Sequence, residues 1–286
     1  MIESIRKAER SVLLLDCGAV FVPQKDTAEF MLDTMELMGY DALNLGSPEF
    51  YFGKEFLEHT RSHVSFPYIA SNLLYDGSRI PWTREYLIKE VGGIKVAILG
   101  VLNPDGLAQL PNQEQVKGLQ VIPPETALNR LLPEVKGKAD LVILLSLFDV
   151  KETIALVKAT KGVDVAISSG SDDVFYAEAL ENTVILQTGS QGKTLGLLKI
   201  TLDEKRVLSV NERQHVPLRS SVSGNEKIER LVETFKNAQE QKAADLAKEK
   251  LEKTDKALKE GLQLSPEEFM ERYRKEQTEM RRGEPR

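Results

Sequence analysis

Short apolar runs alternate with amphipathic segments along most of the chain. The clearest runs lie at residues 12–15, 42–45, 141–145 and 163–168. Largely apolar runs of this length are typical of strands that are covered on both faces. The segments between them, such as residues 27–38, repeat apolar positions with the spacing of a helix that packs on one side. This alternation predicts an α/β fold.

Turn residues between later apolar runs predict β-hairpins. Residues 86–101 contain Gly92-Gly93 between two such runs, which indicates one hairpin. A Gly-Ser-Gln-Gly turn separates residues 183–187 from residues 194–202, and we expect these two segments to pair with each other. Together with the earlier alternation, the hairpins predict two mixed sheets packed together between layers of helices.

The composition changes near Asn225. By direct count, residues 225–286 hold 15 acidic and 15 basic side chains, so the net charge of -6 lies in residues 1–224. The Ser-Pro-Glu-Glu sequence that begins at Ser265 is a capping box with proline at the first helical position, so a helix is expected to start there. We expect the preceding helix to end at Gly261. The chain therefore divides into a domain and a charged helical tail.

Composition excludes several classes of protein. The negative charge and the lack of a dense basic run argue against nucleic-acid binding. Cys17 is the one cysteine, so neither an internal disulfide nor a thiolate metal cluster is expected. No apolar stretch approaches ~18 residues, so no membrane span is expected. The N-terminus lacks the apolar core of a secretion signal, which indicates the cytoplasm at face value; an additional upstream segment would allow export, so the location stays open.

Polar or small residues follow four of the apolar runs. They occur in the turn Gly46-Ser47-Pro48-Glu49 and at the ends of LLLDCGAVF (13–21), ADLVILLSL (139–147) and VDVAISSGSDD (163–173). These blocks resemble the signature blocks of the 5′-nucleotidase branch of the metallophosphoesterases, over roughly residues 1–225. The resemblance implies a four-layer α/β/β/α sandwich, here without the family's usual first strand. The helical tail then stands in place of the family's C-terminal substrate domain.

The sequence departs from that family at the metal-ligand positions. In the family a bridging Asp stands at Ala19, a ligand Asn and a catalytic His stand at Ser47 and Pro48, and ligand histidines stand at Leu147, Ser171 and Asp173. Ala, Pro and Leu offer no lone pair to a metal, whereas a two-metal site that activates water needs a bridging carboxylate and several imidazoles. The resemblance therefore predicts a vestigial cleft, made of Asp16, Ala19, Ser47, Pro48, Glu49, Asn72, Leu147, Ser171, Asp172 and Asp173.

We expect a non-catalytic 5′-nucleotidase-like module, a pseudoenzyme that serves as a scaffold or binding subunit and needs no cofactor. One alternative is a divalent-metal-dependent phosphoesterase or nucleotidase with a rearranged site. In that case five carboxylates would have to converge: Asp16, Glu49, Asp149, Asp172 and Asp173. A further alternative is a binder of small molecules that retains the old cleft. On the main hypothesis, the polar residues that the cleft retains have a structural role: they cap loops and stabilise the fold.

Two features indicate a protein partner or self-association. A sheet without its usual first strand exposes an edge that can accept another strand. A long helical tail of alternating charge with sparse apolar residues, here residues 225–286, can dock a partner helix. His59 and His63 have the four-residue spacing of a zinc pair, but no third ligand is evident nearby. We expect these two histidines to form a polar pair on the surface.

Overall fold

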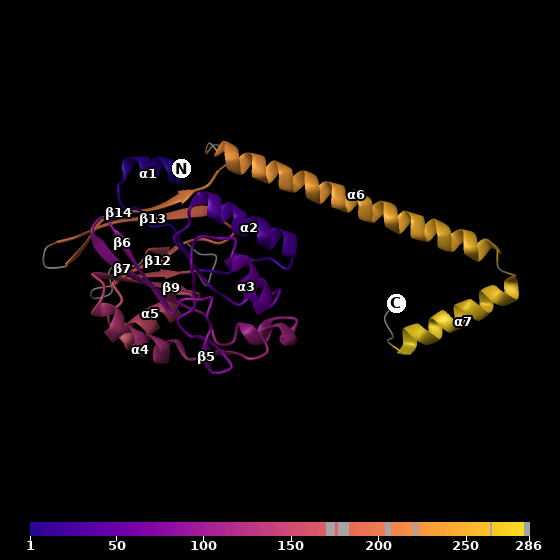
Figure 1. Cartoon of the computed structure of the whole chain (residues 1–286), viewed down its shortest axis with the longest axis horizontal. Helices are drawn as coiled ribbons and strands as arrows, with labels where there is room; N and C mark the ends of the chain where they lie inside the picture. Colours follow the sequence, from indigo (N-terminus) through magenta and orange to yellow (C-terminus); the bar gives the residue numbers. More distant parts are fainter. Residues whose placement is uncertain are drawn as a thin grey trace. The chain divides into compact units, whose positions relative to one another are not determined.

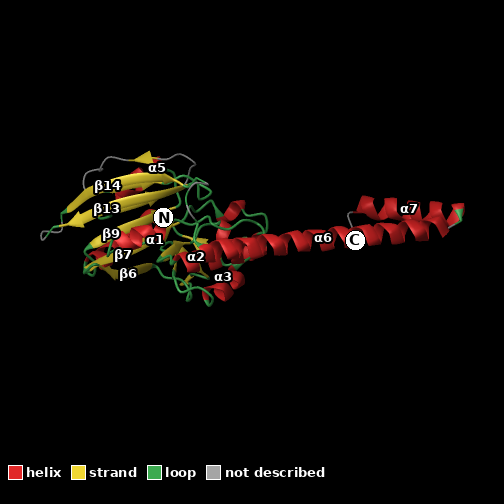
Figure 2. Cartoon of the chain, turned by 90° about the horizontal axis from the view of Figure 1, so that it is seen from above, coloured by secondary structure: helices red, strands yellow, loops and turns green. Residues whose placement is uncertain are grey.

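The computed structural model describes residues 1–169, 175–176, 183–203, 207–219, 222, 224–263 and 265–282. The chain forms two compact units, Met1–Asn225 and Glu226–Arg286. The first unit is a layered α/β domain and the second consists of two helices (Figures 1 and 2).

A six-stranded sheet forms the centre of the first unit, with its strands in the order β11-β12-β10-β9-β7-β6. The strands are β6 (Tyr86–Val91), β7 (Ile94–Val101), β9 (Leu141–Ser146), β10 (Val165–Ser168), β11 (Phe175–Tyr176) and β12 (Val184–Gln187). The four inner strands run parallel, and β6 and β11 join antiparallel at the two edges. The predicted hairpin over residues 86–101 is confirmed, because Val91 pairs with Ile94 across the two glycines.

Three smaller sheets complete the strand content of the described residues. The first is a parallel sheet of β1 (Leu15–Asp16), β2 (Ala42–Asn44) and β3 (Tyr68–Ile69). The second is an antiparallel sheet of β4 (Leu73–Tyr75), β5 (Ser78–Arg79) and β8 (Leu119–Val121). The third is a long antiparallel ribbon of β13 (Thr194–Leu202) and β14 (Leu208–Pro217). In the parallel sheet β1 lies at an edge and pairs only with β2 within the described part of the chain.

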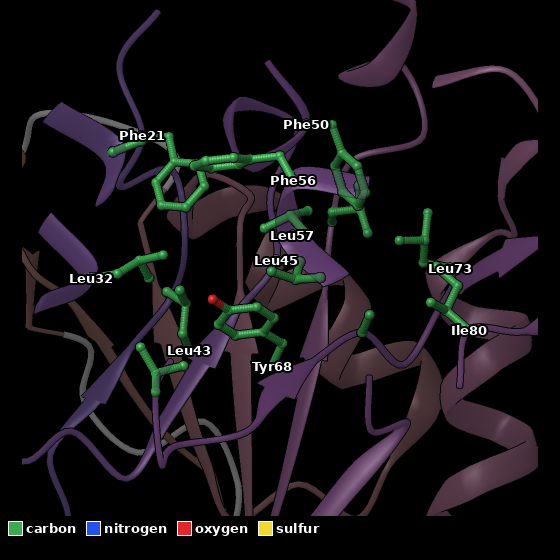
Figure 3. Packing of buried hydrophobic residues seen from close by; sticks show 14 of the residues in the cluster. Phe21, Leu32, Leu43, Leu45, Phe50, Phe56, Leu57, Tyr68, Leu73 and Ile80 are labelled. Atoms are coloured by element: carbon green, nitrogen blue, oxygen red, sulfur yellow. The ribbon is translucent and has the colours of Figure 1, made fainter. Parts of the chain in front are cut away.

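Helices cover both sides of these sheets. They are α1 (Ile2–Ala8), α2 (Lys25–Met38), α3 (Lys54–Arg61), α4 (Pro124–Lys136) and α5 (Val150–Thr160), with single 3-10 turns η1 (Pro48–Phe50), η2 (Leu107–Gln109) and η3 (Gln113–Val116). α4 and α5 lie on one face of the six-stranded sheet (Figure 1), where Leu128 and Leu156 share a core with Leu144. α2 and α3 pack against β2 and β3, where Leu32 and Leu57 share a core with Leu43 (Figure 3).

A third apolar cluster lies between the six-stranded sheet and the strands of the second layer. It joins Ile98 and Ile143 of the large sheet to Cys17, and Leu15 and Leu198 pack against it from β1 and β13. The order of layers is therefore helix, sheet, sheet, helix. This arrangement confirms the α/β fold class expected from the sequence, because each apolar strand needs a covered face on both sides.

Two expectations from the sequence are wrong. The segment 194–202 does not pair with residues 183–187, since β13 pairs with β14 and β12 lies parallel to β10. Hydrophobic patterning marks both segments as strands but does not choose partners, and β12 belongs to the parallel sheet. Gly261 does not end a helix, because it lies within α6. A single glycine costs only about 1 kcal/mol inside a helix, so it need not stop one.

The second unit contains α6 (Glu226–Gln263) and α7 (Pro266–Arg282). The predicted capping box is confirmed: the backbone N–H of Ser265 donates to Glu268 Oε2 at 2.8 Å, and the backbone N–H of Glu268 donates to Ser265 Oγ at 3.4 Å. Ion pairs one turn apart, such as Lys253 with Glu249, line the surface of α6. None of the helices in the described ranges has the length and apolar character needed to cross a membrane.

Candidate functional site

The loops that follow β1, β2 and β9 meet at the carboxyl ends of their strands. A β-carbon added at Gly46 would stand 2.6 Å from Leu147 Cδ2, 3.1 Å from Glu49 Oε2 and 3.2 Å from the backbone nitrogen of Ala19. Four residues from three loops are thus in contact or nearly so. The carboxyl ends of strands in α/β folds are the usual place of a binding site, so this meeting point is the candidate site.

Glu49 is the centre of the site. Its side chain is fully buried. Oε1 accepts hydrogen bonds from the backbone N–H groups of Val20 at 2.6 Å and Phe21 at 3.2 Å. Oε2 accepts hydrogen bonds from the backbone N–H groups of Gly46 at 2.7 Å and Ala19 at 3.1 Å. Burial raises the pKa of Glu49, and the four N–H donors oppose that rise because they favour the charged form.

The loop after β1 has a backbone that few sequences can adopt. Gly18 has φ +98° and Ala19 has φ +62°, both in the left-handed region. A β-carbon on Gly18 would stand 2.5 Å from the carbonyl oxygen of Asn44, so only glycine fits. Ala19 has a β-carbon, and the left-handed conformation costs it roughly 1–2 kcal/mol. The hydrogen bonds to Glu49 compensate for part of this cost.

Ser47 and Pro48 form the edge of the site and are half-buried. A β-carbon on Gly106 would stand 2.8 Å from Ser47 Oγ, so the hydroxyl lies against the loop that follows β7. Pro48 occupies the first position of η1, where its missing N–H is not needed. Pro48 therefore serves the local backbone, and the Ser47 side chain makes no capping hydrogen bond to η1.

Asp16 is half-buried and lies close enough to Glu49 for the two charges to interact. Oδ1 accepts a hydrogen bond from the backbone N–H of Gly18 at 2.9 Å. Burial raises the pKa of Asp16 to about 6, and the charge of Glu49 adds to the rise. Burial likewise raises the pKa of the Cys17 thiol, which donates to the carbonyl of Ile167, so this thiol stays protonated and unreactive at neutral pH.

Asn44 is a residue of the site that the sequence interpretation missed. It is fully buried, and its Nδ2 donates to the carbonyl oxygens of Cys17 at 2.9 Å and Val101 at 3.2 Å. The amide thereby connects the loop after β1 to the end of β7 in the other sheet. A polar residue inside the apolar run 42–45 was the available signal, because a buried amide must find hydrogen-bond partners.

Asn72 lies apart from the contacts around Gly46. Its amide donates to the carbonyl oxygens of Leu102 at 3.0 Å and Ile122 at 3.1 Å, and it accepts from the N–H of Leu102. Asp149 is the N-cap of α5, where its Oδ1 accepts from the N–H of Glu152 at 2.8 Å. Ser171, Asp172 and Asp173 lie outside the described residues.

The described residues do not fit a two-metal centre. Within the described ranges, no three His, Cys, Asp or Glu side chains come together in a way that could hold a metal ion. Both oxygens of Glu49 are taken by N–H groups, and the side chain of Leu147 occupies the space beside Gly46. His59 and His63 contact each other on the surface with ring centroids 4.6 Å apart, and no third ligand joins them in that part of the chain.

Comparisons with known proteins identify relatives of one kind. No family model matches the sequence. The uncharacterized metallophosphoesterase YunD of Bacillus subtilis is 28% identical over 215 residues, which make up 71% of this chain and 46% of that protein. A 5′-nucleotidase of Vibrio cholerae is 34% identical over 142 residues, or 46% of this chain and 25% of that protein. The chain thus spans less than half the length of both curated relatives.

Solved structures show the same fold. A 5′-nucleotidase precursor from Thermus thermophilus superposes with a TM-score of 0.72 at 21% identity, covering 85% of this chain and 52% of that one. The calcineurin-like phosphoesterase YfkN of Bacillus subtilis superposes with a TM-score of 0.69 at 22% identity, covering 83% of this chain and 86% of that one. At such identities the likeness establishes the fold alone.

Proposed function

We propose that this chain, whose curated relatives and structural neighbours include 5′-nucleotidases and calcineurin-like phosphoesterases, is a non-catalytic 5′-nucleotidase-like metallophosphoesterase module that acts as a scaffold or binding subunit. Its relatives are phosphoesterases, so any hydrolysis by the chain would act on phosphate esters. The proposal rests on the residues that occupy the candidate site.

One observation carries the proposal: Leu147 lies where the three loops meet. Its terminal carbon packs against Gly46, beside the carboxylate of Glu49 and the backbone of Ala19. A two-metal hydrolase needs ligands with lone pairs at such a meeting point, because the two ions must be held and water must reach them. Here an alkyl group and an alanine stand there, and the nearby carboxylate of Glu49 is already bound by four N–H groups.

The second part of the proposal is a protein partner or a second copy of the chain. The edge of β1 and the tail support it. Leu251, Phe269 and Tyr273 of the tail are 70%, 52% and 51% exposed. Exposed side chains of this size on amphipathic helices are typical of surfaces that bind another helix.

The deciding experiment measures bound metal and hydrolysis together. The purified chain is incubated with excess Mn²⁺ or Zn²⁺, desalted, and analysed by elemental mass spectrometry, and is then assayed with nucleoside monophosphates and bis(p-nitrophenyl) phosphate. We expect no stoichiometric metal and no turnover. Retention of about two equivalents of metal would overturn the proposal, because that is the content of a two-metal site.

A variant with restored ligand types serves as the positive control. It carries Ala19→Asp, Ser47→Asn and Leu147→His, and aspartate tolerates the left-handed backbone at position 19 better than most residues. We expect this variant to retain more metal than the natural chain under the same conditions. Equal retention by both chains, at a stoichiometric level, would show that the natural residues already bind metal and would contradict the proposal.

A further inference from the structure

The four N–H groups around Glu49 form a concave set of donors. Three of them are successive backbone amides, at Ala19, Val20 and Phe21, and the fourth belongs to Gly46 on a different loop. Backbone N–H groups that converge in this way form a nest, which is a binding site for anions. In this protein the nest is occupied by one of its own side chains, that of Glu49.

The hydrogen-bond pattern requires an anion in the nest. Each oxygen of Glu49 accepts two N–H bonds, so the four acceptor positions of an ionised carboxylate are all used. A proton on either oxygen would take the place of one donor. An empty nest would leave four amides without these partners, and the amides of the buried residues Phe21 and Gly46 would each cost about 1–3 kcal/mol.

The nest also holds the two loops in place. Gly18 and Ala19 have positive φ angles, and this backbone directs the next N–H groups toward Glu49. Gly46 follows β2, so the carboxylate joins the loop after β1 to the loop after β2. Without an anion between them, nothing among these contacts would oppose the relaxation of Ala19 to an ordinary backbone conformation.

We propose that these four amides form a built-in anion-binding site whose resident ligand is the Glu49 carboxylate, and that removing this side chain converts the nest into a site for a small monocarboxylate such as acetate. The proposal concerns the nest alone. It holds whether or not the chain hydrolyses phosphate esters, so the metal experiment and the one below can fail independently.

Size and charge favour acetate over larger anions. An alanine at position 49 keeps the β-carbon, and the atoms that it lacks are one carbon and a carboxyl group, which together have the size of acetate. The charge of Glu49 helps to raise the pKa of Asp16, so a negative charge in the nest is repelled by the Asp16 carboxylate. Tyr68, on which the charge of Glu49 also acts, has a pKa raised by burial to about 12 and is neutral at pH 7. A monoanion is therefore tolerated better than a dianion such as phosphate.

The test uses the full chain with Glu49→Ala. We expect a large fall in melting temperature and a saturable recovery with sodium acetate of about 3 °C or more, compared with sodium chloride at equal ionic strength. Binding is observed directly as line broadening of ¹³C-labelled acetate. If the variant is unfolded without additives, the readout is the acetate-dependent return of its near-UV circular dichroism.

Three matched samples complete the test. The natural chain and the exposed variant Glu134→Ala should show no difference between acetate and chloride. Glu49→Gln should be destabilised and should not respond to acetate, because its amide fills the nest but turns an NH₂ group toward N–H donors. The proposal is overturned if Glu49→Ala shows neither an acetate-specific shift, nor recovery of folding, nor broadening of the acetate signal.

Discussion

Gly100 of β7 lies directly against Asn44 of β2, so closely that a β-carbon on Gly100 would collide with Oδ1 of Asn44. The two residues belong to different sheets. The amide of Asn44 uses this close approach to reach the carbonyl oxygens of Cys17 and Val101. The absence of a side chain at position 100 is therefore what allows one buried amide to connect the two layers.

This contact predicts a coupling between the two positions. Asn44→Ala should destabilise the domain by about 3 kcal/mol, because two buried carbonyl groups lose their donor. Gly100→Ala should cost a similar amount through the collision. In the double variant the new methyl group at position 100 enters the space that the Asn44 side chain has left. The double variant should therefore lose less stability than the sum of the losses of the two single variants. Urea unfolding of the four chains gives the coupling energy. Simple additivity would show that the collision is relieved elsewhere.

Gly18 and Gly77 form a natural pair for measuring backbone constraint. Both have positive φ, +98° and +73°, but a β-carbon on Gly77 meets nothing within 4 Å, whereas one on Gly18 meets the carbonyl oxygen of Asn44. Gly77→Ala should cost about 1 kcal/mol from conformation alone. Gly18→Ala should cost at least about 3 kcal/mol, because the collision with backbone is added. Equal losses in urea unfolding would contradict the close approach at Gly18.

Asp16 should make the domain less stable as the pH rises. Its pKa is about 6 in the folded chain against an ordinary value of 3.8, so the folded state binds this proton more tightly than the unfolded state does. The stabilisation from the bound proton is complete below about pH 4 and is lost as the pH rises through about 6, on the order of 3 kcal/mol in all.

The measurement compares the natural chain with Asp16→Asn, which keeps an acceptor for the N–H of Gly18. From pH 4 to pH 7 the free energy of unfolding of the natural chain should fall relative to that of the variant. Parallel pH profiles of the two chains would mean that Asp16 has an ordinary pKa and is better solvated than its surroundings indicate.

The tail predicts self-association if a second copy is the partner. Phe269→Ser combined with Tyr273→Ser removes two large exposed apolar side chains from α7 and should shift sedimentation from an oligomer to the monomer. Leu37→Ser is the matched control, since Leu37 is 51% exposed on the first unit. A natural chain that sediments as a monomer over a wide range of concentration would contradict self-association and leave a different protein as the partner.

Much of the fold was accessible from the sequence because it depends on local patterns. Apolar runs and turn residues marked the strands at residues 86–101 and 141–145, and the capping box at Ser265 marked the start of α7. The pairing of β13 with β14 was not accessible, since both candidate partners of β13 have strand-like sequences. Choice of partner depends on the packing of the whole layer.

The sequence by itself determined the fold class, the change of composition near residue 225 and the loop residues that follow the apolar runs, because these follow from hydrophobic periodicity and residue content. Only the tertiary structure decided what the residues at those positions do. It placed Leu147 against Gly46, gave Glu49 four N–H partners from two loops, and showed Asn44 as the connection between the sheets. Such contacts join residues far apart in the chain, and the burial that makes them energetically important exists only after the layers have packed.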